Sequence, residues 1–403
     1  MPPTEPTYDV AIIGAGPVGA TLAALLAAEG VAAAIVDSAP LPPMELPAFD
    51  GRCYAIALAS QRILARAGIW DRLPEPPCAI EHIRIADGRP GERPSPLSLH
   101  FDGDEVGEDA FGWMVEARAL RVALNARLPS LPSLSVHAPA TATVTRDESG
   151  ATLVLSDGTR LRARLVVAAE GRGSPLRRQA GIRVSTIDYG CTGLVGAIAH
   201  ELPHNNTALE KFLPNGPFAQ LPINGTPEHP NASAIVWSDR TPIAQKVLAM
   251  DDAGYGREIA RRLGDHLGAV RPIGRRWSYP LSALHAHRYT ATRLALVGDA
   301  AHGIHPIAGQ GLNLGFRDVG ALATLIATAH HAGEDPGSPE LLARYQAMRR
   351  PDALMMLGAT HALERLFGND FAPVRIARRL GIAAVGRVPA LKRFFIRRAM
   401  GTA

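Results

Sequence analysis

The stretch Val10-Ala-Ile-Ile-Gly14-Ala-Gly16-Pro-Val-Gly19 decides the fold, because it sets a GxGxxG pattern directly after an apolar run and directly before an Ala/Leu-rich segment. Gly14 permits a tight turn, Gly16 lets the backbone approach a pyrophosphate, and Gly19 lets a helix pack closely on a strand. The N-terminus of such a helix offers free N–H groups and the positive end of a dipole to phosphates. The pattern therefore predicts a dinucleotide site.

The residues around the glycines support this interpretation. Residues 8–13 predict a buried strand, 17–29 a helix and 31–37 a second strand. Asp37 ends the second strand, 23 residues after Gly14, where a carboxylate suits a hydrogen bond to a ribose hydroxyl. The pattern alone does not separate NAD from FAD.

The same region is free of charge from residue 10 to residue 28, as a membrane span or signal peptide would be. No Lys or Arg precedes Arg52, and the glycines interrupt the stretch. We therefore expect a soluble or peripheral protein, cytoplasmic or on the inner face of the plasma membrane. The three cysteines, Cys53, Cys78 and Cys191, are widely spaced, which predicts free thiols and no metal site.

The chain has 403 residues, enough for two or three domains. We predict an α/β fold in which a Rossmann-like, doubly wound nucleotide-binding domain is interrupted by a β-rich substrate-binding lobe and followed by C-terminal helices. The nucleotide-binding domain is expected at 1–80, 108–183 and 284–335, the β-rich lobe at 81–107 and 184–283, and the helices with a basic tail at 336–403.

Local patterns add further elements. Residues 54–68, 116–128 and 310–329 predict helices, residues 151–169 a hairpin around Asp157-Gly158, and residues 293–298 a strand. From residue 340 onward the pattern is helical, and we expect breaks at three prolines: Pro351, Pro373 and Pro389.

Three further segments carry a family resemblance: Asp50-Gly-Arg52, Ala169-Glu170-Gly-Arg-Gly-Ser-Pro-Leu-Arg177 and Gly298-Asp299-Ala-Ala-His302. They resemble segments of the class A, para-hydroxybenzoate hydroxylase-like flavin monooxygenases. The resemblance implies that Arg52 lies beside a flavin and that Asp299 contacts the ribityl chain of FAD. Glu170 departs from this group, which usually has Asp there.

The third segment continues as His305-Pro-Ile-Ala-Gly309-Gln-Gly-Leu-Asn313-Leu-Gly315, which looks like the signature of the ubiquinone-biosynthesis hydroxylases. This narrower resemblance implies an FAD-dependent monooxygenase that hydroxylates a polyprenylated phenol through a flavin C4a-hydroperoxide. NAD(P)H or a reductase would donate electrons, and O2 would be the co-substrate.

The motifs and the resemblance together predict the site. We expect the cofactor to be bound by Gly14, Gly16, Gly19, Asp37, Arg52, Arg118, Glu170, Asp299, Gly309, Gly311, Leu312 and Asn313. We expect catalytic roles for Pro306, His305 and Arg52. The N–H groups at Gly309–Gly311 would stabilise negative charge on reduced flavin.

The identity of a general base stays open. The candidates are His302, His305, Tyr189 and Tyr279, and a structural role is an alternative for each.

The C-terminal residues 371–403 carry eight basic residues and no acidic one, against a net charge of +4 for the whole chain. Apolar residues alternate with these Arg and Lys residues, which favours docking on anionic lipid or on other quinone-biosynthesis proteins. A nucleic-acid partner is not expected. Two alternatives to a polyprenyl-phenol hydroxylase remain: a monooxygenase for a small soluble aromatic, and a flavin-bound, non-catalytic scaffold subunit.

Overall fold

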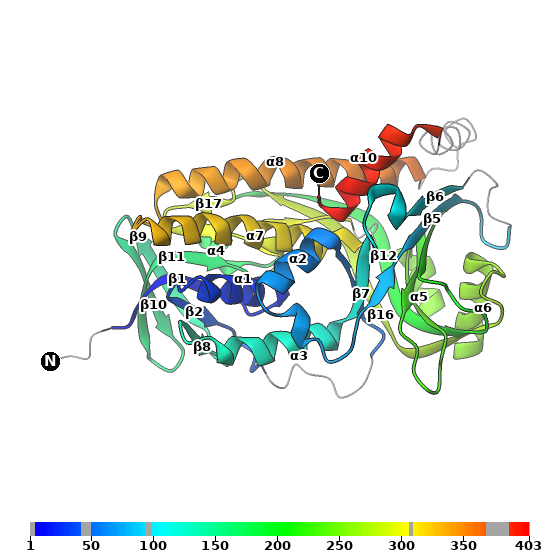
Figure 1. Cartoon of the computed structure of the whole chain (residues 1–403), viewed down its shortest axis with the longest axis horizontal. Helices are drawn as coiled ribbons and strands as arrows, with labels where there is room; N and C mark the ends of the chain where they lie inside the picture. Colours follow the sequence, from blue (N-terminus) through cyan, green and yellow to red (C-terminus); the bar gives the residue numbers. More distant parts are fainter. Residues whose placement is uncertain (1–4, 42–49, 93–97, 306–308, 368–386, 403) are drawn as a thin grey trace.

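The computed structural model describes residues 5–41, 50–92, 98–305, 309–367 and 387–402. They form three β-sheets and the helices that pack around them (Figure 1). This mixture, with helices at the C-terminal end, confirms the predicted α/β class. The boundaries of the separate domains stay a prediction.

The first sheet is parallel in its centre and antiparallel at its margin. Its parallel strands, in spatial order, are β18 (Leu294–Leu296), β11 (Arg160–Ala168), β1 (Thr7–Ile13), β2 (Ala33–Val36) and β8 (Leu134–His137). Its antiparallel strands are β17 (Thr290–Ala291), β10 (Gly150–Leu155) and β9 (Ala142–Asp147). The three strands predicted at 8–13, 31–37 and 293–298 and the hairpin predicted at 151–169 are confirmed.

The uncharged stretch at 10–28 forms β1 and helix α1 (Pro17–Ala28). Nine of the 12 residues of α1 are buried, because the helix is covered by the sheet and by neighbouring helices. An all-round apolar helix is thus explained by the protein core. None of the described helices is both long and apolar enough to cross a lipid bilayer.

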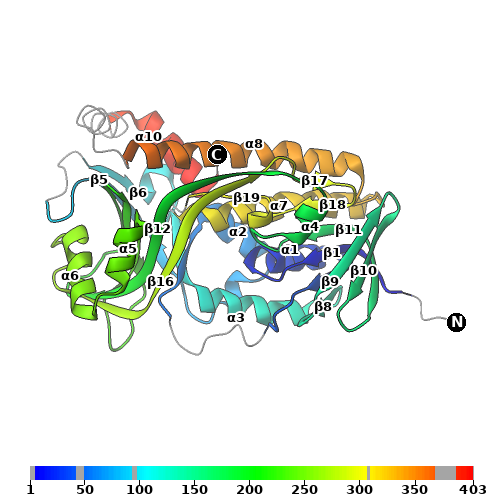
Figure 2. The same cartoon turned by 180° about the vertical axis from the view of Figure 1, so that it is seen from behind.

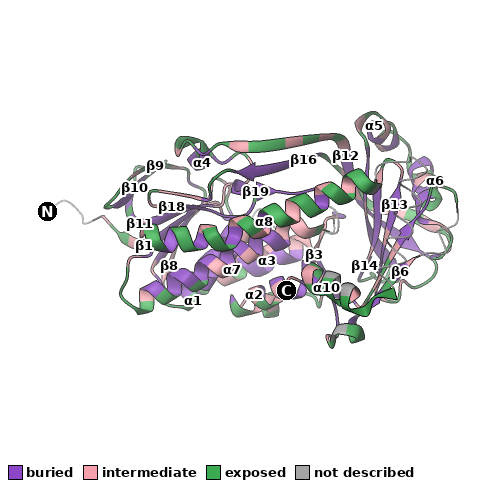
Figure 3. Cartoon of the chain, turned by 90° about the horizontal axis from the view of Figure 1, so that it is seen from above, coloured by how far each residue is buried: buried purple, intermediate pink, exposed green. Residues whose placement is uncertain are grey.

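The remaining helices near this sheet include the long α7 (Gln310–His331), which packs on α1 and on α8 (Pro339–Phe367) (Figure 3). The others are α2 (Leu58–Arg66), α3 (Ala117–Arg127), α4 (Pro175–Gln179) and the short 3-10 turns η2 (Trp70–Arg72), η4 (Leu128–Ser130) and η5 (Gly298–Ala300). The predicted helices at 116–128 and 310–329 are confirmed as α3 and α7.

The second sheet has eight strands and takes two of them from an early part of the chain. Its spatial order is β19 (His302–Gly303), β16 (Val270–Ala286), β12 (Val184–His200), β15 (Ala232–Arg240), β14 (Gly216–Ile223), β13 (Thr207–Leu213), β5 (His82–Asp87) and β6 (Leu99–Asp102). The 17-residue strands β12 and β16 run together from the first sheet into the lobe (Figure 2).

Two helices in the lobe differ from the expectation of strands and turns there. They are α5 (Thr241–Leu248) and α6 (Asp252–Leu263). Asp251 caps α6 by accepting a hydrogen bond from the backbone N–H of Gly254, at 2.8 Å. Tyr255, Ile259 and Leu263, spaced by four residues, bury one face of α6 on the sheet. Gly254 and Gly256 in the first turns of α6 made this helical periodicity hard to recognise in the sequence.

The third sheet is small and antiparallel, and it corrects one prediction. Its strands are β3 (Cys53–Ala57), β7 (Gly112–Glu116) and β4 (Cys78–Ile80). Residues 54–68 were expected to be one helix, but 53–57 pair with β7 and the helix begins at Leu58. Pairing with a strand about 60 residues away outweighs the local helical preference of these residues.

The C-terminal helices correct another prediction. Pro351 lies inside α8 and does not end it. Contacts on both sides of the proline hold the helix: Tyr345 donates a hydrogen bond to the carbonyl of Leu296, and Ala353 is fully buried. Pro389 does begin a helix, α10 (Pro389–Met400), whereas Pro373 lies outside the described residues. One further 3-10 turn, η3 (Gly103–Val106), lies between β6 and β7.

Candidate functional site

The three glycines of the first loop have different surroundings. A Cβ atom on Gly14, whose φ is +106°, would lie 2.5 Å from the carbonyl oxygen of Ala169. A Cβ on Gly19 would lie 2.0 Å from the carbonyl oxygen of Gly14. A Cβ on Gly16 would have no described atom within 4 Å, so this glycine faces open space at the N-terminus of α1. The loop therefore leaves a cradle in front of free backbone N–H groups.

Asp37 stabilises the loop from the end of β2. Its carboxylate accepts hydrogen bonds from the backbone N–H of Ala15, at 2.6 Å, and from that of Ala39, at 2.8 Å. A carboxylate has about four acceptor positions, so these bonds leave room for a ribose hydroxyl.

Helix α3 brings a different arginine to the loop from the one predicted. Arg118 is paired with Glu116, at 2.7 Å, and lies 3.8 Å from Glu75. Arg121 instead donates a hydrogen bond to the carbonyl of Ala15, at 2.8 Å. Burial lowers the pKa of Arg121. Only the rotation of α3 in the folded chain decides which arginine faces the loop, and the sequence does not show that rotation.

Arg52 is held in place by its neighbours. Its side chain donates to Asp50 at 2.7 Å, and this hydrogen bond raises its pKa. Its guanidinium also lies 4.3 Å from the ring centroid of Trp277 on β16. Trp277, in turn, donates from its indole N–H to the carbonyl of Asp50, at 2.7 Å. Sequence reasoning missed Trp277, since nothing local links it to residue 52.

Glu170 is bound within its own turn. Its carboxylate accepts hydrogen bonds from the hydroxyl of Ser174, at 2.5 Å, and from the backbone N–H of Leu176, at 3.2 Å. Burial raises its pKa, although both hydrogen bonds act in the opposite direction. Glu170 thus caps α4, and a part for it in cofactor binding stays a prediction.

Asp299 lies at the junction of two helix N-termini. Its side chain is half exposed and lies 3.4 Å from Arg172. A Cβ on Gly315 of α7 would lie 2.8 Å from Val18 of α1, and one on Gly298 would lie 3.3 Å from the same side chain. The starts of α1 and α7 and the turn that carries Asp299 are therefore in contact.

Asn313 in α7 is used structurally. Its amide oxygen accepts from the N–H of Ala57, at 2.9 Å, and its amide nitrogen donates to the carbonyl of Ala55, at 2.8 Å. These bonds hold the start of α7 against β3. Gly309 caps the helix with a φ of +63°, and a Cβ on Gly311 would meet no atom outside the helix within 4 Å among the described residues.

Leu312 and Pro306 are two of the remaining residues that the sequence predicted for the cofactor and catalytic site. Leu312 is half-buried and packs on the core of the first sheet. Pro306 lies outside the described residues.

His305 lies in a cluster of aromatic polar groups. It is 1% exposed, and its ring centroid is 4.8 Å from that of Tyr189, which is 5.9 Å from His361. Within the described part of the chain, Nδ1 of His305, Nδ1 of His361 and the hydroxyl of Tyr189 have no hydrogen-bond partner. Burial lowers the pKa of His305 to about 4, so its ring is neutral at pH 7.

The structure separates the four candidate bases. His302 forms a hydrogen bond with Asp318, at 2.6 Å. Arg349 belongs to the same buried network, because its Nε donates to Asp318 at 2.8 Å. Burial alone would raise the pKa of Asp318, but these two partners outweigh it and the pKa is lowered. Tyr279 is exposed, and His305 and Tyr189 lie together.

Asp318 was not among the predicted residues. It also accepts from the backbone N–H of Gly298, at 3.0 Å, and so supports the turn that carries Asp299. The sequence signal that could have pointed to Asp318 was a single acidic residue within the apolar pattern of α7.

The residues present fit FAD. Gly16 and Gly311 leave open space at two adjoining helix N-termini, where N–H groups and dipoles suit a pyrophosphate and an electron-rich ring edge. Asp37 and Arg121 add an acceptor and a cation at the first loop, since both form hydrogen bonds with the backbone of Ala15.

Comparison with known proteins agrees with this geometry. A family model described as an FAD binding domain matches residues 7–360. The chain is 50% identical over 395 residues to the ubiquinone hydroxylase UbiL of Rhodospirillum rubrum, which covers 98% of this chain and 90% of that protein. It is 34% identical to the 3-demethoxyubiquinol 3-hydroxylase of Escherichia coli, over 98% of this chain and 99% of that protein.

Solved structures are also similar. PqsL of Pseudomonas aeruginosa, in complex with 2-aminobenzoylacetate, has a TM-score of 0.77 at 25% identity and covers 95% of this chain and 100% of its own. The p-nitrophenol 4-monooxygenase PnpA of Pseudomonas putida has a TM-score of 0.78 at 18% identity, covering 98% and 99%, which shows the fold alone.

Proposed function

Since the chain belongs to the FAD-binding family of class A flavin monooxygenases that includes the ubiquinone hydroxylases, we propose that it hydroxylates the ring of a polyprenylated phenol in ubiquinone biosynthesis. The observation that carries the substrate is the 50% identity to a ubiquinone hydroxylase along nearly the whole of both chains.

The second and third sheets support an apolar substrate. Between them lies a hydrophobic cluster to which both sheets and α10 contribute, including Phe101, Met114, Phe212 and Ile396. Cys53 and Ala55 of β3, just after Arg52, are partly buried against the same cluster. An apolar ring bound beside Arg52 would therefore meet the partly buried Cys53 and Ala55 at the edge of this cluster.

When bound, FAD supplies the redox chemistry, taking electrons from NAD(P)H or a reductase and transferring one oxygen atom of O2 to the ring. The protein itself binds and orients the cofactor and the substrate. The start of α1, with Gly16 open, would hold the pyrophosphate, and Asp37 would accept from a ribose hydroxyl. Gly311 at the start of α7 would present backbone N–H groups to the flavin ring edge.

The Tyr189–His305 pair orients the phenol hydroxyl. A phenol has a pKa of about 10, whereas that of His305 is lowered to about 4. Moving the proton to His305 would therefore be strongly unfavourable. His305 therefore accepts a hydrogen bond from the hydroxyl and does not take up its proton.

The test is deletion of the gene followed by mass analysis of quinone precursors. We expect a precursor that lacks one ring oxygen to accumulate, and the wild-type gene to restore the quinone. An unchanged quinone pool would contradict the proposal. Purified protein with ¹⁸O2 should place one labelled oxygen on a prenylated phenol. Turnover of only a small soluble aromatic would instead favour the alternative of a monooxygenase for such compounds.

A scaffold role has a separate signature. If flavin in the purified protein is not reduced by any donor in the presence of a prenylated phenol, yet other quinone-biosynthesis proteins fail to assemble without this chain, the role is non-catalytic.

A further inference from the structure

Strand β13 of the second sheet (Figure 3) carries an acidic residue, Glu210, in a stretch that is otherwise buried. Five of the seven residues of β13 are buried, and Glu210 is the one between Ala208 and Leu213 that keeps accessible surface. Its carboxyl forms no hydrogen bond or ion pair with any residue that the structure describes. An enclosed polar group of this kind calls for a partner from outside the chain.

The alternation of side chains along β13 shows where Glu210 points. Ala208 and Phe212, two residues before and after it, belong to the hydrophobic cluster between the second and third sheets. Leu209 and Leu213 belong to the cluster on the opposite face of the second sheet. Because successive side chains of a strand point to opposite faces, Glu210 lies on the face of Ala208 and Phe212. Its carboxyl therefore points toward the cluster proposed for the apolar substrate.

The strand register connects Glu210 with the region of Arg52. One continuous row of paired residues crosses five neighbouring strands, from β13 to β16: Glu210, Ala219, Val236, Val195 and Trp277. Residues paired directly across a sheet point to the same face. The ring of Trp277 lies against the guanidinium of Arg52, so Arg52 lies on the face of the second sheet that carries Glu210.

The same cluster reaches the start of α7. Ala55 of β3 packs against the cluster, and a Cβ on Gly309, which caps α7, would lie 3.2 Å from the Cβ of Ala55. Gly309 follows His305 by four residues. The cluster thus extends from the helix start proposed for the flavin ring edge to the strand that carries Glu210.

The surroundings of Glu210 favour the neutral carboxylic acid. Burial raises its pKa to about 7. Titratable side chains at the margin of the same cluster include Asp87, Cys53, Cys78, Glu116 and Lys392, and none of them is a hydrogen-bond or ion-pair partner of Glu210 within the described part of the chain. An apolar ligand that displaces water shifts the carboxyl further toward its neutral form, which is a hydrogen-bond donor.

A prenylated phenol offers few acceptors for this donor. Its prenyl tail has no oxygen atom, and its hydroxyl is the group proposed to lie at Tyr189 and His305. The acceptor that remains is a second oxygen on the ring.

We propose that Glu210 is a specificity-determining residue, which donates a hydrogen bond to a second oxygen substituent of the substrate ring, a hydroxyl or a methoxyl. It selects rings that already carry such an oxygen over those with the phenol hydroxyl alone. This selectivity rests on the proposed function and narrows its substrate class.

The experiment measures binding to the FAD-loaded protein by calorimetry. The probes are ortho-geranylphenol and the same phenol with one added hydroxyl or one added methoxyl at each free ring position. Glu210→Leu removes the donor, whereas Glu210→Gln retains a donating N–H group in a similar volume. The control is Glu228→Leu, which replaces an exposed acid of the same lobe. Flavin content verifies that each variant is folded.

We expect the wild type and Glu228→Leu to bind at least one oxygenated probe about tenfold more tightly than ortho-geranylphenol, as one hydrogen bond of ordinary strength provides. The preference should disappear in Glu210→Leu and persist in Glu210→Gln, an outcome that a purely structural role would not produce. Comparison of the hydroxylated with the methoxylated probes identifies the substituent.

The pH dependence gives a second readout. Above its pKa of about 7, the carboxyl of Glu210 loses the proton that it donates. In the wild type the preference should therefore be constant below about pH 7 and weaken above it, whereas in Glu210→Gln it should not depend on pH.

Absence of a preference in the wild type, or an equal preference in Glu210→Leu, would overturn the selectivity. A preference that strengthens above pH 7 would also overturn it, because the carboxylate would then be accepting a proton from the ligand. Turnover separates the two proposals: hydroxylation without any binding preference leaves the proposed function intact and removes the role of Glu210. A preference that follows Glu210 without hydroxylation of any probe supports that role and contradicts the proposed function.

Discussion

At the scale of single residues, the glycines of the first loop differ in what a side chain would meet. Side chains on Gly14 or Gly19 would collide with backbone atoms, so these two glycines are required for folding. Gly16 has an ordinary extended conformation and open space in front of it. We therefore expect its lack of a side chain to serve a ligand and not the fold.

Replacing Gly16 with Val should therefore leave folding intact and weaken FAD binding at least tenfold, since the Cβ branches fill the cradle in front of α1. Flavin fluorescence titration of the apoprotein measures the affinity, and thermal unfolding measures the fold. Gly358→Ala in α8, where a Cβ also meets nothing, is the matched control and should bind FAD normally. Normal affinity in Gly16→Val would remove this loop from the cofactor site.

The burial of His305 makes the stability of the folded protein depend on pH. Its pKa in the folded protein is about 4, against about 6.5 in the unfolded chain. The unfolded state therefore binds the proton first as the pH falls, and stability that is complete above pH 6.5 is lost between pH 6.5 and about 4.

In His305→Asn this contribution should vanish. Between pH 6.5 and 5 the free energy of unfolding should fall about 2 kcal/mol less than in the wild type, from about 1.4 kcal/mol per pH unit for one proton. Urea unfolding at several pH values measures the slopes. The slope should not reach zero, because burial also lowers the pKa of His285 to about 4. Identical slopes in both proteins would show that folding does not lower the pKa of His305.

At the scale of elements, long-range contacts decide where helices begin and end. Residues 53–57 form a strand because β7 pairs with them and Asn313 satisfies their last N–H and carbonyl groups. α8 continues through Pro351 because its packing on α7 and on the first sheet outweighs the cost of a proline.

That cost can be measured with Pro351→Ala. An interior proline is about 3 kcal/mol less favourable in a helix than alanine, while its loss makes the unfolded chain more flexible by about 1 kcal/mol. We expect a net gain of about 1–2 kcal/mol and a melting temperature a few degrees higher. Pro389→Ala, at the first turn of α10 where no N–H is missed, should change little. A loss of stability in Pro351→Ala would mean that the packing of α8 depends on the proline.

At the scale of the whole molecule, β12 and β16 join the two halves of the protein. Both strands run from the first sheet into the lobe, and Trp277 on β16 bonds back to Asp50 beneath Arg52. A strand of the second sheet thus holds an arginine that lies just before β3 of the third sheet.

Trp277→Leu should separate cofactor retention from turnover. We expect FAD content close to that of the wild type, because the glycine loop is untouched, and a turnover rate about tenfold lower, because Arg52 loses the ring and the Asp50 carbonyl loses its donor. Trp277→Phe, which retains a ring under Arg52, should lie between the two. A flavin content that falls in step with the rate would assign Trp277 to cofactor retention.

The amino-acid sequence by itself determined the nucleotide-binding unit, the α/β class and the family. Tight turns with a positive φ, and the contact of a helix with a strand, demand glycine at fixed spacings, so local order is enough to recognise them. The predicted contacts of Gly14 and Gly19 needed no knowledge of the rest of the chain.

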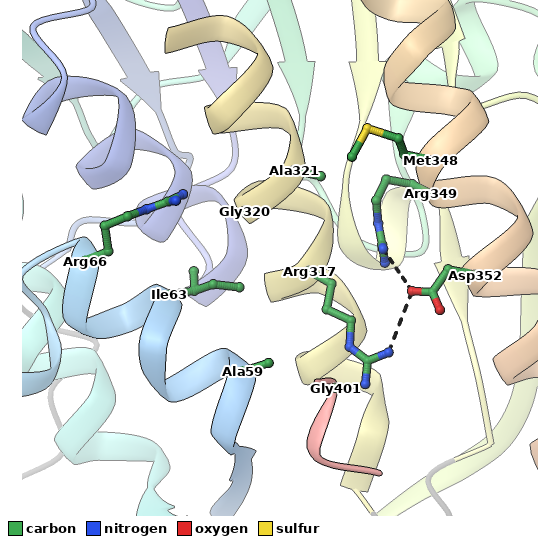
Figure 4. A pocket seen from close by; sticks show the side chains of 10 residues that line it. All are labelled: Ala59, Ile63, Arg66, Arg317, Gly320, Ala321, Met348, Arg349, Asp352 and Gly401. Atoms are coloured by element: carbon green, nitrogen blue, oxygen red, sulfur yellow. Dashed lines mark ion pairs between the residues drawn. The ribbon is translucent and has the colours of Figure 1, made fainter. Parts of the chain in front are cut away.

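Only the tertiary structure decided which arginine of α3 faces the loop, which strand holds Arg52, and that Asp318, His302 and Arg349 form one buried network. The cavity among α2, α7 and α8 that Arg66, Arg317 and Arg349 line (Figure 4) also belongs here, since these helices begin as far apart as residues 58 and 339. The physical reason is the same in each case: a side chain's direction depends on how its element is rotated by packing, and that rotation is set by residues distant in the sequence.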